Sequence, residues 1–557
     1  MPAMPELPPG APAQRSGSLL RSTGVVSAAT LLSRITGLVR DALISNYFSA
    51  PVSDAFLAAS RVPNLLRFLF AEGAFSAAFI PTFIRIHKQR GREEADRLAT
   101  SLLRLLALVT TVVSIVGILT APWFVSIYLP GWSDDPEKIS LSLLLIRIMF
   151  PFLIFICLAG LAMGQLNSLG RLGIPALSPV LFNLTNIIFL VAAGAFFAGV
   201  APDLWGAVNA LDFVAGRFPS TQVLMVVGLS VALVLGGAFQ WLFQVPSLRR
   251  EGLFRQLRGG LWHPETRRIM LLMGPMVLGL AGNQLALLIN TMLATHVEEG
   301  AVSALYYANR LFQFPLGVLA IAISTAAFPR LAGRTLSEDR GPFHREVNHS
   351  LRMLFFVMLP STVGLVVLSA PAVYLVYQHG RFAHENLFDR TVWALVAYSI
   401  GLIGHSGVKV LSTAFYSFHN TKTPVRVTLA CLGLNVTCSI LFILVLDFGA
   451  TGLAAATTIS ALTNVSLLAW LLGRFIGRDW QGGLARSFWG CLLASVGMGV
   501  AVTALLGMLP WPLDSKGTAA LQLGLGIPLG VVAYLGLTWL LAREELQVFV
   551  RDLRRRG

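Results

Sequence analysis

Ten charged residues lie inside stretches of sequence that are otherwise apolar, and these side chains are the best suited to bind a polar ligand. Guanidinium groups match phosphates and carboxylates through paired hydrogen bonds. A charge at the centre of a bilayer costs at least ~2.5–3.5 kcal/mol, so such groups must face one another or water. The acids are Asp41, Asp54 and Glu72. The cations are Arg34, Arg40, Arg61, Arg67, Arg147, Arg310 and Lys409.

The spacing of these residues places several of them on shared helical faces. Arg34 and Asp41 are seven residues apart, which is close to two helical turns. Asp54, Arg61 and Glu72 follow one another at spacings of 7 and 11, again near whole turns. We therefore expect two helices that each present a charged face to the same interior space.

The balance of charge in this group favours an anionic ligand. Three acids can neutralise only three of the seven cations. An unpaired buried arginine is costly unless an anion binds it, so we expect a cationic cavity between helices. Pro63 removes a backbone hydrogen bond and should kink its helix near these charges. The alternative is that the charged residues only pair with one another and hold helices together.

Motifs for catalysis and for cofactors are absent from the sequence. It contains no GxxxxGK[ST] loop for ATP phosphates, no HExxH and no EF-hand loop. The four cysteines lie in apolar runs without metal-ligand or CxxC spacing. We therefore expect neither an enzyme nor a cofactor or metal site. Energy for any transport would have to come from an ion gradient or the membrane potential.

The composition indicates how these side chains are positioned. Of 557 residues, 55% are hydrophobic and only 12% are charged, which excludes a soluble protein. Apolar runs of this length predict transmembrane helices rather than the short strands of a barrel. The fold class expected is all-α integral membrane, with fourteen spans at roughly 24–48, 53–84, 99–128, 140–166, 174–200, 222–247, 268–294, 301–329, 349–378, 391–418, 425–446, 449–473, 487–509 and 518–542.

The Lys and Arg residues outside the spans predict the orientation. With a cytoplasmic N-terminus, thirty of the 42 Lys and Arg residues fall in inside segments. The outside loops hold five, which are Lys138, Arg217, Arg381, Arg390 and Lys516. This bias places both termini in the cytoplasm. It also accounts for the formal charge of +15, so no nucleic-acid partner is expected.

An internal repeat divides the chain. Arg61 and Arg310 stand at equivalent positions, 249 residues apart, and Ser168 and Ser417 are equivalent at the same offset. The repeat predicts two six-helix lobes related by a pseudo-two-fold axis, plus two C-terminal helices, which is a transporter architecture. The units expected are a disordered cytoplasmic tail (1–22), an N-lobe (23–247), a basic cytoplasmic linker (248–267), a C-lobe (268–473) and the last two helices with a basic tail (474–557).

Four stretches resemble one known family. They are SRITGLVRDALISNYF (33–48), SDAFLAASRVPNLLRFLFAEGAFSAAFIP (53–81), YYANRLFQFPLGVLAIAISTAAFPRL (306–331) and GLIGHSGVKVLSTAFYSFHNTKTPV (401–425). With these stretches the chain resembles the MurJ/MviN family of lipid II flippases. That family belongs to the MATE-like multidrug/oligosaccharidyl-lipid/polysaccharide superfamily. The combination of PNLLR with FAEGAFS is the most specific part of this match.

The resemblance implies a function and a set of substrate-binding residues. The family moves lipid II, an undecaprenyl diphosphate that carries a disaccharide-pentapeptide, from the cytoplasmic to the periplasmic leaflet of the bacterial inner membrane. The last two helices would extend a groove for its isoprenoid tail. The implied binding residues are Arg34, Arg40, Arg67 and Arg310, the partner or gating acids Asp41 and Asp54, Glu72 of FAEGAFS, and the nearby Ser33, Arg61 and Asn64.

Several alternatives stay open at this point. The chain could be a flippase for another lipid-linked glycan, a MATE-like exporter, or a membrane scaffold for cell-wall synthesis proteins. A drug exporter should favour carboxylates over arginines in its cavity, which the sequence opposes. A coupling cation is a further expected partner, because some relatives bind one on their seventh, eleventh and twelfth helices. Asn283, Asn435 and Thr457 are the candidates for it here.

Overall fold

The computed structural model describes residues 16–68, 74–199, 218–253, 262–333, 339–477, 479–509, 513 and 515–554. Within these ranges every regular element is helical, as the long apolar runs predict. The first half of the chain contains α1 (Ser16–Tyr47), α2 (Ala50–Arg67), α3 (Ala74–Gln89), α4 (Gly91–Tyr128), η2 (Pro130–Trp132), α5 (Pro136–Met149), α6 (Phe152–Ser168), α7 (Gly173–Gly199), α9 (Ser220–Leu242) and α10 (Val245–Arg250).

The second half repeats this pattern and two long helices follow it. It contains α11 (Pro264–Ala294), α12 (Ala301–Pro315), the π-helical η5 (Leu316–Ala320), α13 (Ile321–Ala332), α14 (Gly341–Val367), α15 (Ser369–Tyr377), α16 (Gly380–His384), α17 (Leu387–Ile400), α18 (Leu402–Ser417), α19 (Lys422–Leu444) and α20 (Gly449–Ile476). The chain then continues through η6 (Asp479–Gln481), α21 (Leu484–Met508), α22 (Lys516–Leu541) and α23 (Arg543–Arg554).

Fourteen membrane crossings account for this order of helices. Ten are helices, or pairs of consecutive helices, that are long and apolar enough to cross a bilayer. The other four are α1, α2 with α3, α11, and α12 with α13. Three of these four carry the buried charges that the sequence singled out. This order of helices agrees with the number of spans predicted from hydropathy. The least apolar spans are the ones that bring polar groups into the interior.

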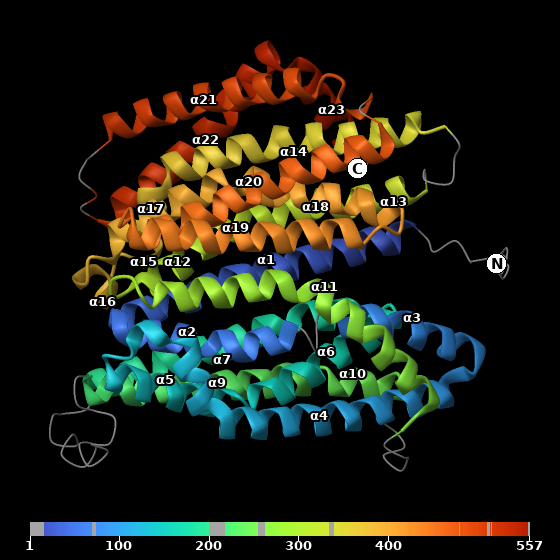
Figure 1. Cartoon of the computed structure of the whole chain (residues 1–557), viewed down its shortest axis with the longest axis vertical. Coiled ribbons are helices and arrows are strands. Elements are labelled where there is room, and N and C mark those ends of the chain that lie inside the picture. Colours follow the sequence, from blue (N-terminus) through green and yellow to red (C-terminus); the bar gives the residue numbers. More distant parts are fainter. Residues whose placement is uncertain are drawn as a thin grey trace.

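The two halves lie side by side along the bundle (Figure 1). Helices α2 to α10 form one side, α12 to α20 form the other, and α1 runs between them. Helix α11 joins them, since it packs against α3 of the first half and α19 of the second. Helices α21 and α22 lie on the far side of the second half, where α21 packs against α14 and α22 against α15. The N-terminus of α1 and helix α23 mark one end of the bundle, which we call the terminal end; α16 marks the opposite end.

The second and eighth spans contain π-helical residues at matching places. Helix α2 contains Pro63 and ends at Arg67, with Phe68 in a π-helical turn. In the other half, α12 ends at Pro315 and the π-helical η5 follows it. Pro63 lies inside α2, close to its charged residues, and the kink expected there stays a prediction. Such π-helical segments are frequent at functional sites.

One boundary differs from the sequence-based expectation. Helix α1 already begins at Ser16, inside the segment 1–22 that was expected to be a disordered tail. Residues 1–15 lie outside the described ranges, as does Glu72. The exact limits of the two lobes and of the basic linker stay predictions.

Candidate functional site

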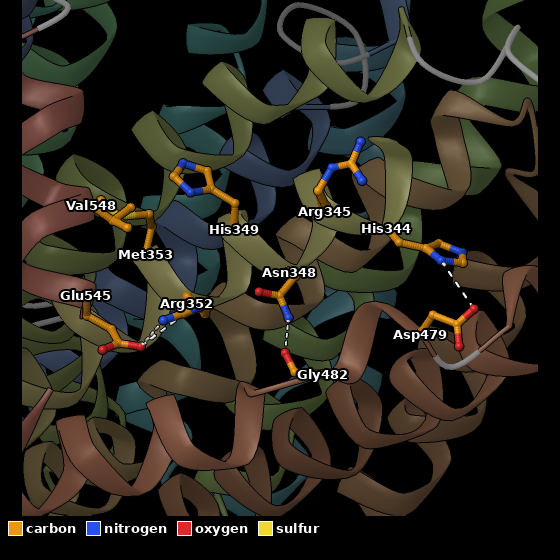
Figure 2. A pocket seen from close by; sticks show the side chains of 10 residues that line it. All are labelled: His344, Arg345, Asn348, His349, Arg352, Met353, Asp479, Gly482, Glu545 and Val548. Atoms are coloured by element: carbon orange, nitrogen blue, oxygen red, sulfur yellow. Dashed lines mark hydrogen bonds and ion pairs between the residues drawn. The ribbon is translucent and has the colours of Figure 1, made fainter. Parts of the chain in front are cut away.

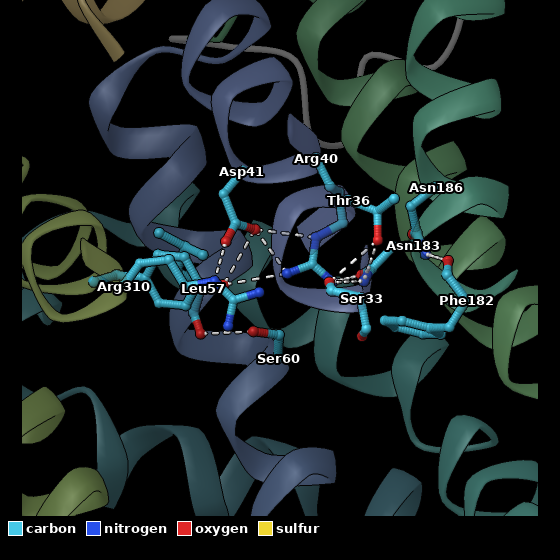
Figure 3. Close-up of polar contacts among 11 residues, drawn as sticks. Ser33, Thr36, Arg40, Asp41, Leu57, Ser60, Phe182, Asn183, Asn186 and Arg310 are labelled. Carbon is cyan, nitrogen blue, oxygen red and sulfur yellow. Dashed lines mark hydrogen bonds and ion pairs between the residues drawn. The ribbon is translucent and has the colours of Figure 1, made fainter. Parts of the chain in front are cut away.

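The centre of the site is the carboxylate of Asp41, which is completely buried in α1. Its neighbour Arg40 donates to Oδ1 from Nε and Nη2, at 3.0 and 2.7 Å. Arg310, on α12 of the other half, places Nε 2.7 Å from Oδ2. The hydroxyl of Tyr306 also donates to Oδ1, at 3.3 Å. Two guanidinium groups from opposite halves therefore meet at one acid (Figure 3).

Asn183 on α7 holds Arg40 in position. Its Nδ2 donates to the backbone oxygen of Ser33 at 3.0 Å and to the hydroxyl of Thr36 at 3.2 Å. Its Oδ1 accepts from Nη1 of Arg40 at 3.2 Å. Because a single amide bonds both the α1 backbone and the guanidinium, Asn183 fixes the helix and the side chain together (Figure 3).

Two adjoining cavities open onto these charges. A central cavity of ≈ 490 Å³ lies between the halves and is lined by Arg40, Arg61, Asn64, Arg67 and Arg310, among others. A side cavity of ≈ 550 Å³ is lined by Ser33, Arg34 and Arg310. Asn183 and Arg310 line both cavities. Volumes of this size are typical of ligand sites. Arg310 keeps 33% of its side chain exposed, so it remains accessible despite its ion pair.

Two glycines provide the space for these guanidinium groups. A Cβ at Gly317, in η5, would lie 2.0 Å from Nη2 of Arg34. A Cβ at Gly37, in α1, would lie 2.3 Å from Nη2 of Arg310. Arg34 also donates from Nη1 to the backbone oxygen of Gln313 at 3.2 Å. In each half, a glycine thus leaves room for an arginine side chain of the other half to lie against the helix backbone.

Asp54 does not line either cavity. It is buried at the opposite end, where Nζ of Lys138 lies 3.1 Å from Oδ2. Its carboxylate also accepts from the backbone N–H groups of Gly300 and Ser303, at 2.9 and 2.8 Å, and from the Ser303 hydroxyl at 2.7 Å. Asp54 therefore serves as an inter-half contact, which fits the gating role that the family resemblance implied.

Lys138 is a buried cation. It was counted among the cations of the outside loops, yet it is 3% exposed and belongs to the first turn of α5. Its ammonium group lies 4.0 Å from the centre of the Trp132 ring as well as beside Asp54. A buried cation of this kind is stabilised by its acid and by the aromatic face. Hydropathy alone cannot distinguish it from a solvated loop lysine.

Further contacts join the halves at the opposite end. The backbone N–H of Gly131 donates to the Thr295 hydroxyl at 3.1 Å. The backbone N–H of Ala50, at the start of α2, donates to the carboxylate of Glu385. Together with Asp54, these contacts form what we call the outer contact: Asp54, Gly131 and Ala50 from one half, and Ser303, Thr295 and Glu385 from the other. In this arrangement the two halves are closed at the opposite end.

The terminal end has a separate polar pocket of ≈ 360 Å³ beneath α23 (Figure 2). Most of its polar groups are engaged. Arg352 donates to Glu545 at 2.6 Å, and Asn348 donates to the backbone oxygens of Trp480 and Gly482. This pocket therefore holds α23 against α14 and the loop before α21.

The candidate residues for a coupling cation show only amide and hydroxyl contacts. Asn435 donates to the Thr457 hydroxyl at 3.3 Å, and Asn290 donates to the same hydroxyl at 3.2 Å. The side chain of Asn283 lies outside the described ones. No group of three or more His, Cys, Asp or Glu side chains that could hold a metal occurs within the described ranges. The coupling cation stays a prediction.

Sequence reasoning missed several residues of the site. Asn183, Tyr306 and Gly317 are uncharged, so a search for buried charges could not select them. For Tyr306 and Gly317 the signal was present, since both lie in a stretch that carried the family resemblance. Of the predicted set, the structure brings Arg40, Asp41 and Arg310 into contact and places Arg61, Asn64 and Arg67 on the same cavity. Ser33 and Arg34 line the side cavity.

Comparisons with known proteins agree with this architecture. The chain is 33% identical over 545 residues to the "Probable lipid II flippase MurJ" of Vibrio cholerae, covering 94% of this chain and 97% of that protein. It is 33% identical over 500 residues to the "Lipid II flippase MurJ" of Burkholderia cenocepacia, covering 89% and 90%.

Solved structures show the same fold. A structure described as "Lipid II flippase MurJ, inward closed conformation" matches with a TM-score of 0.72 and 24% identity, over 95% of this chain and 99% of that one. An inward-facing MATE family multidrug transporter of the MOP superfamily matches with a TM-score of 0.65 and 16% identity, over 82% and 98%. The family profile described as "Lipid II flippase MurJ" matches residues 44–530. The chain therefore belongs to the MurJ family of lipid II flippases.

Proposed function

We propose that this protein moves lipid II from the cytoplasmic to the periplasmic leaflet of the inner membrane by alternating access. It is a transport protein rather than an enzyme, and the names of its relatives support lipid II as the substrate. The single observation that carries the mechanism is the cluster at Asp41, where Arg40 and Arg310 from the two halves meet beside a cavity.

The diphosphate of the substrate is the ligand that this cluster suits. Asp41 neutralises one of its two arginines. Arg34 lines the adjoining cavity and, among the described residues, it bonds to a backbone oxygen and pairs with no acid. A guanidinium group binds phosphate oxygens through two parallel hydrogen bonds. Arg34 and Arg310 are held by opposite halves, so a diphosphate bound by both would link the halves. Movement of the halves about the bound head group would then carry it across the membrane.

The closed outer contact implies an access direction. Because the halves are joined at the opposite end, the cavity is expected to receive its ligand from the terminal end. The distribution of Lys and Arg predicts that the terminal end faces the cytoplasm. The isoprenoid tail would remain in the bilayer, beside α21 and α22. A coupling cation, if one is used, would act on this same movement.

A depletion strain tests the proposal. Arg40→Ala and Arg310→Ala should each abolish growth support while the protein still inserts at normal levels. Arg171→Ala is the matched control, because Arg171 is 64% exposed and pairs with Glu251 at 2.8 Å on the surface. In proteoliposomes, the wild-type protein should make lipid II accessible at the far leaflet and the two cavity variants should not. Normal growth with both cavity variants would contradict the proposal.

A further inference from the structure

The repeat places two arginines in equivalent positions but gives them different partners. Arg310 follows Arg61 by 249 residues, and Asn290 follows Asp41 by the same 249. Arg310 of the second half binds Asp41 of the first. The symmetric counterpart of that ion pair is Arg61 of the first half with Asn290 of the second. The side chain of Asn290 is an uncharged amide, so it does not neutralise Arg61. The Arg61–Asn290 pair therefore keeps the full positive charge of Arg61.

The contacts of Arg61 agree with this reading. Among the described residues, Arg61 has no acid or hydrogen-bond partner, and its Nε is buried without one. The Oδ1 atom of Asn290 is likewise buried without a partner, while its Nδ2 donates to Thr457. Both residues line the central cavity. Tyr306 and Tyr398 line the same cavity.

An unpaired guanidinium at this depth requires an anion for at least part of the transport cycle. The diphosphate is already assigned to Arg34 and Arg310, which also line the side cavity. The central cavity, which Arg61 lines, adds the neutral hydrogen-bonding groups Asn64, Asn290 and Tyr398 to its arginines. A planar carboxylate suits one guanidinium, and amides suit the peptide bonds beside it.

We propose that Arg61 and Asn290 form a second subsite, which binds a carboxylate of the pentapeptide carried by the substrate. This subsite rests on the proposed function, because it takes lipid II as the ligand. The two subsites divide the head group: the arginines around Asp41 bind the diphosphate, and Arg61 binds the peptide. The protein therefore distinguishes lipid II from undecaprenyl diphosphate that lacks the disaccharide-pentapeptide.

Binding of three ligands to the purified full-length protein in nanodiscs tests this division. The ligands are lipid II, lipid II whose peptide carboxylates have been converted to amides, and undecaprenyl diphosphate. Arg61→Gln should weaken lipid II binding about tenfold, because at least one charge-assisted hydrogen bond to the ligand is lost. It should leave binding of the other two ligands unchanged. Arg310→Gln should weaken all three.

Two further variants separate a ligand contact from a structural role. Asn290→Asp should pair with Arg61 as Asp41 pairs with Arg310, and so reproduce the selective loss of lipid II binding. Arg61→Lys keeps the charge and should retain most of the preference for lipid II over its amidated form. An equal loss of all three ligands in Arg61→Gln, or no loss of any, would overturn the subsite. Failure of the wild-type protein to bind lipid II would instead overturn the proposed function itself.

Discussion

The carboxylate of Asp54 accepts two hydrogen bonds from Ser303, one from the backbone N–H at 2.8 Å and one from the hydroxyl at 2.7 Å. The two residues are 249 positions apart, which is the offset of the internal repeat. Equivalent residues of two symmetric halves can touch only near the axis that relates them. Asp54 and Ser303 therefore mark the axis at the opposite end, and the outer contact is built around it.

Asp54→Asn should weaken the outer contact. The change removes the partner of buried Lys138 and weakens hydrogen bonds that contribute about 1.5–3 kcal/mol each when one group is charged. The population open at the opposite end should rise at least about tenfold. A cysteine at Ser60, in the central cavity, would report this opening through its reaction with an impermeant maleimide added to the periplasmic side, in a background without the four native cysteines.

Asp389→Asn is the matched control for this experiment. Asp389 is an exposed acid in the first turn of α17, near the same end of the bundle. Its replacement should leave the labelling rate unchanged. Equal labelling of the Asp54→Asn and wild-type proteins would show that Asp54 does not hold the outer contact closed.

Gly317→Ala should weaken lipid II binding without unfolding the protein. The added Cβ would lie 2.0 Å from Nη2 of Arg34, so the guanidinium must leave its present place. Binding should fall about tenfold, since one charge-assisted contact is lost. Gly364→Ala is the control, because a Cβ at Gly364 in α14 meets nothing within 4 Å. Thermal stability should be retained in both variants, and wild-type affinity in Gly317→Ala would contradict the assigned role of Arg34.

The outer contact should become more stable as the pH falls. Burial raises the pKa of Glu385 above its ordinary 4.5, and the charges of Glu299 and Asp54 act in the same direction. The hydrogen bond from Ala50 and the charge of Arg381 oppose this shift in pKa, but they do not cancel it. The protonated acid is therefore favoured in the closed arrangement. Its stabilising contribution is complete below pH 4.5 and is lost as the pH rises through the raised pKa.

Cysteine labelling at Ser60 between pH 5 and pH 8 measures this dependence. The labelling rate, corrected for the intrinsic reactivity of the thiol, should rise with pH in the wild-type protein. In Glu385→Gln the dependence should be reduced, because the side chain stays neutral throughout. An unchanged dependence in Glu385→Gln would assign the effect to another group.

Glu545→Gln should release α23 from α14. Arg352 donates to Glu545 from Nε at 3.1 Å and from Nη2 at 2.6 Å, and Glu545 is only 6% exposed (Figure 2). Glu544 is 66% exposed, so Glu544→Gln is the control with a small expected effect. Hydrogen exchange of the α23 amides should accelerate about tenfold in Glu545→Gln and little in Glu544→Gln. Similar exchange in both variants would contradict the role of Glu545.

The membrane fold was predictable because a few strong physical constraints determine it. Long apolar runs can only be helices in a bilayer, and this fixed fourteen spans without any structure. The repeat was visible because Arg61 and Arg310 stand in similar surroundings. The start of α1 was placed too late, because polar residues such as Ser16 and Arg21 lack an apolar pattern yet continue the helix.

The site was predictable only in its charged members. Because a buried charge is costly without a partner, Arg40, Asp41 and Arg310 were each expected to bind a charged or polar group. In the structure they bind one another. The cost of burial does not tell which partner each charge finds. Asp54 is bound by Lys138, which was counted among the cations of the outside loops. The space that Gly317 leaves for Arg34 becomes visible only once two distant helices are packed together.

Asp41 has a second consequence for the energetics of the transport cycle. Arg40 comes from the same helix, so it remains bound to Asp41 however far the halves separate. Separation therefore never leaves a bare carboxylate in the membrane, and only Arg310 needs a substitute partner. An incoming phosphate offers that substitute at the moment when it is needed. Replacement of the Asp41 carboxylate by a substrate phosphate as the partner of Arg310 would lower the energy barrier to separation of the halves when substrate is bound. Without substrate the barrier would stay high.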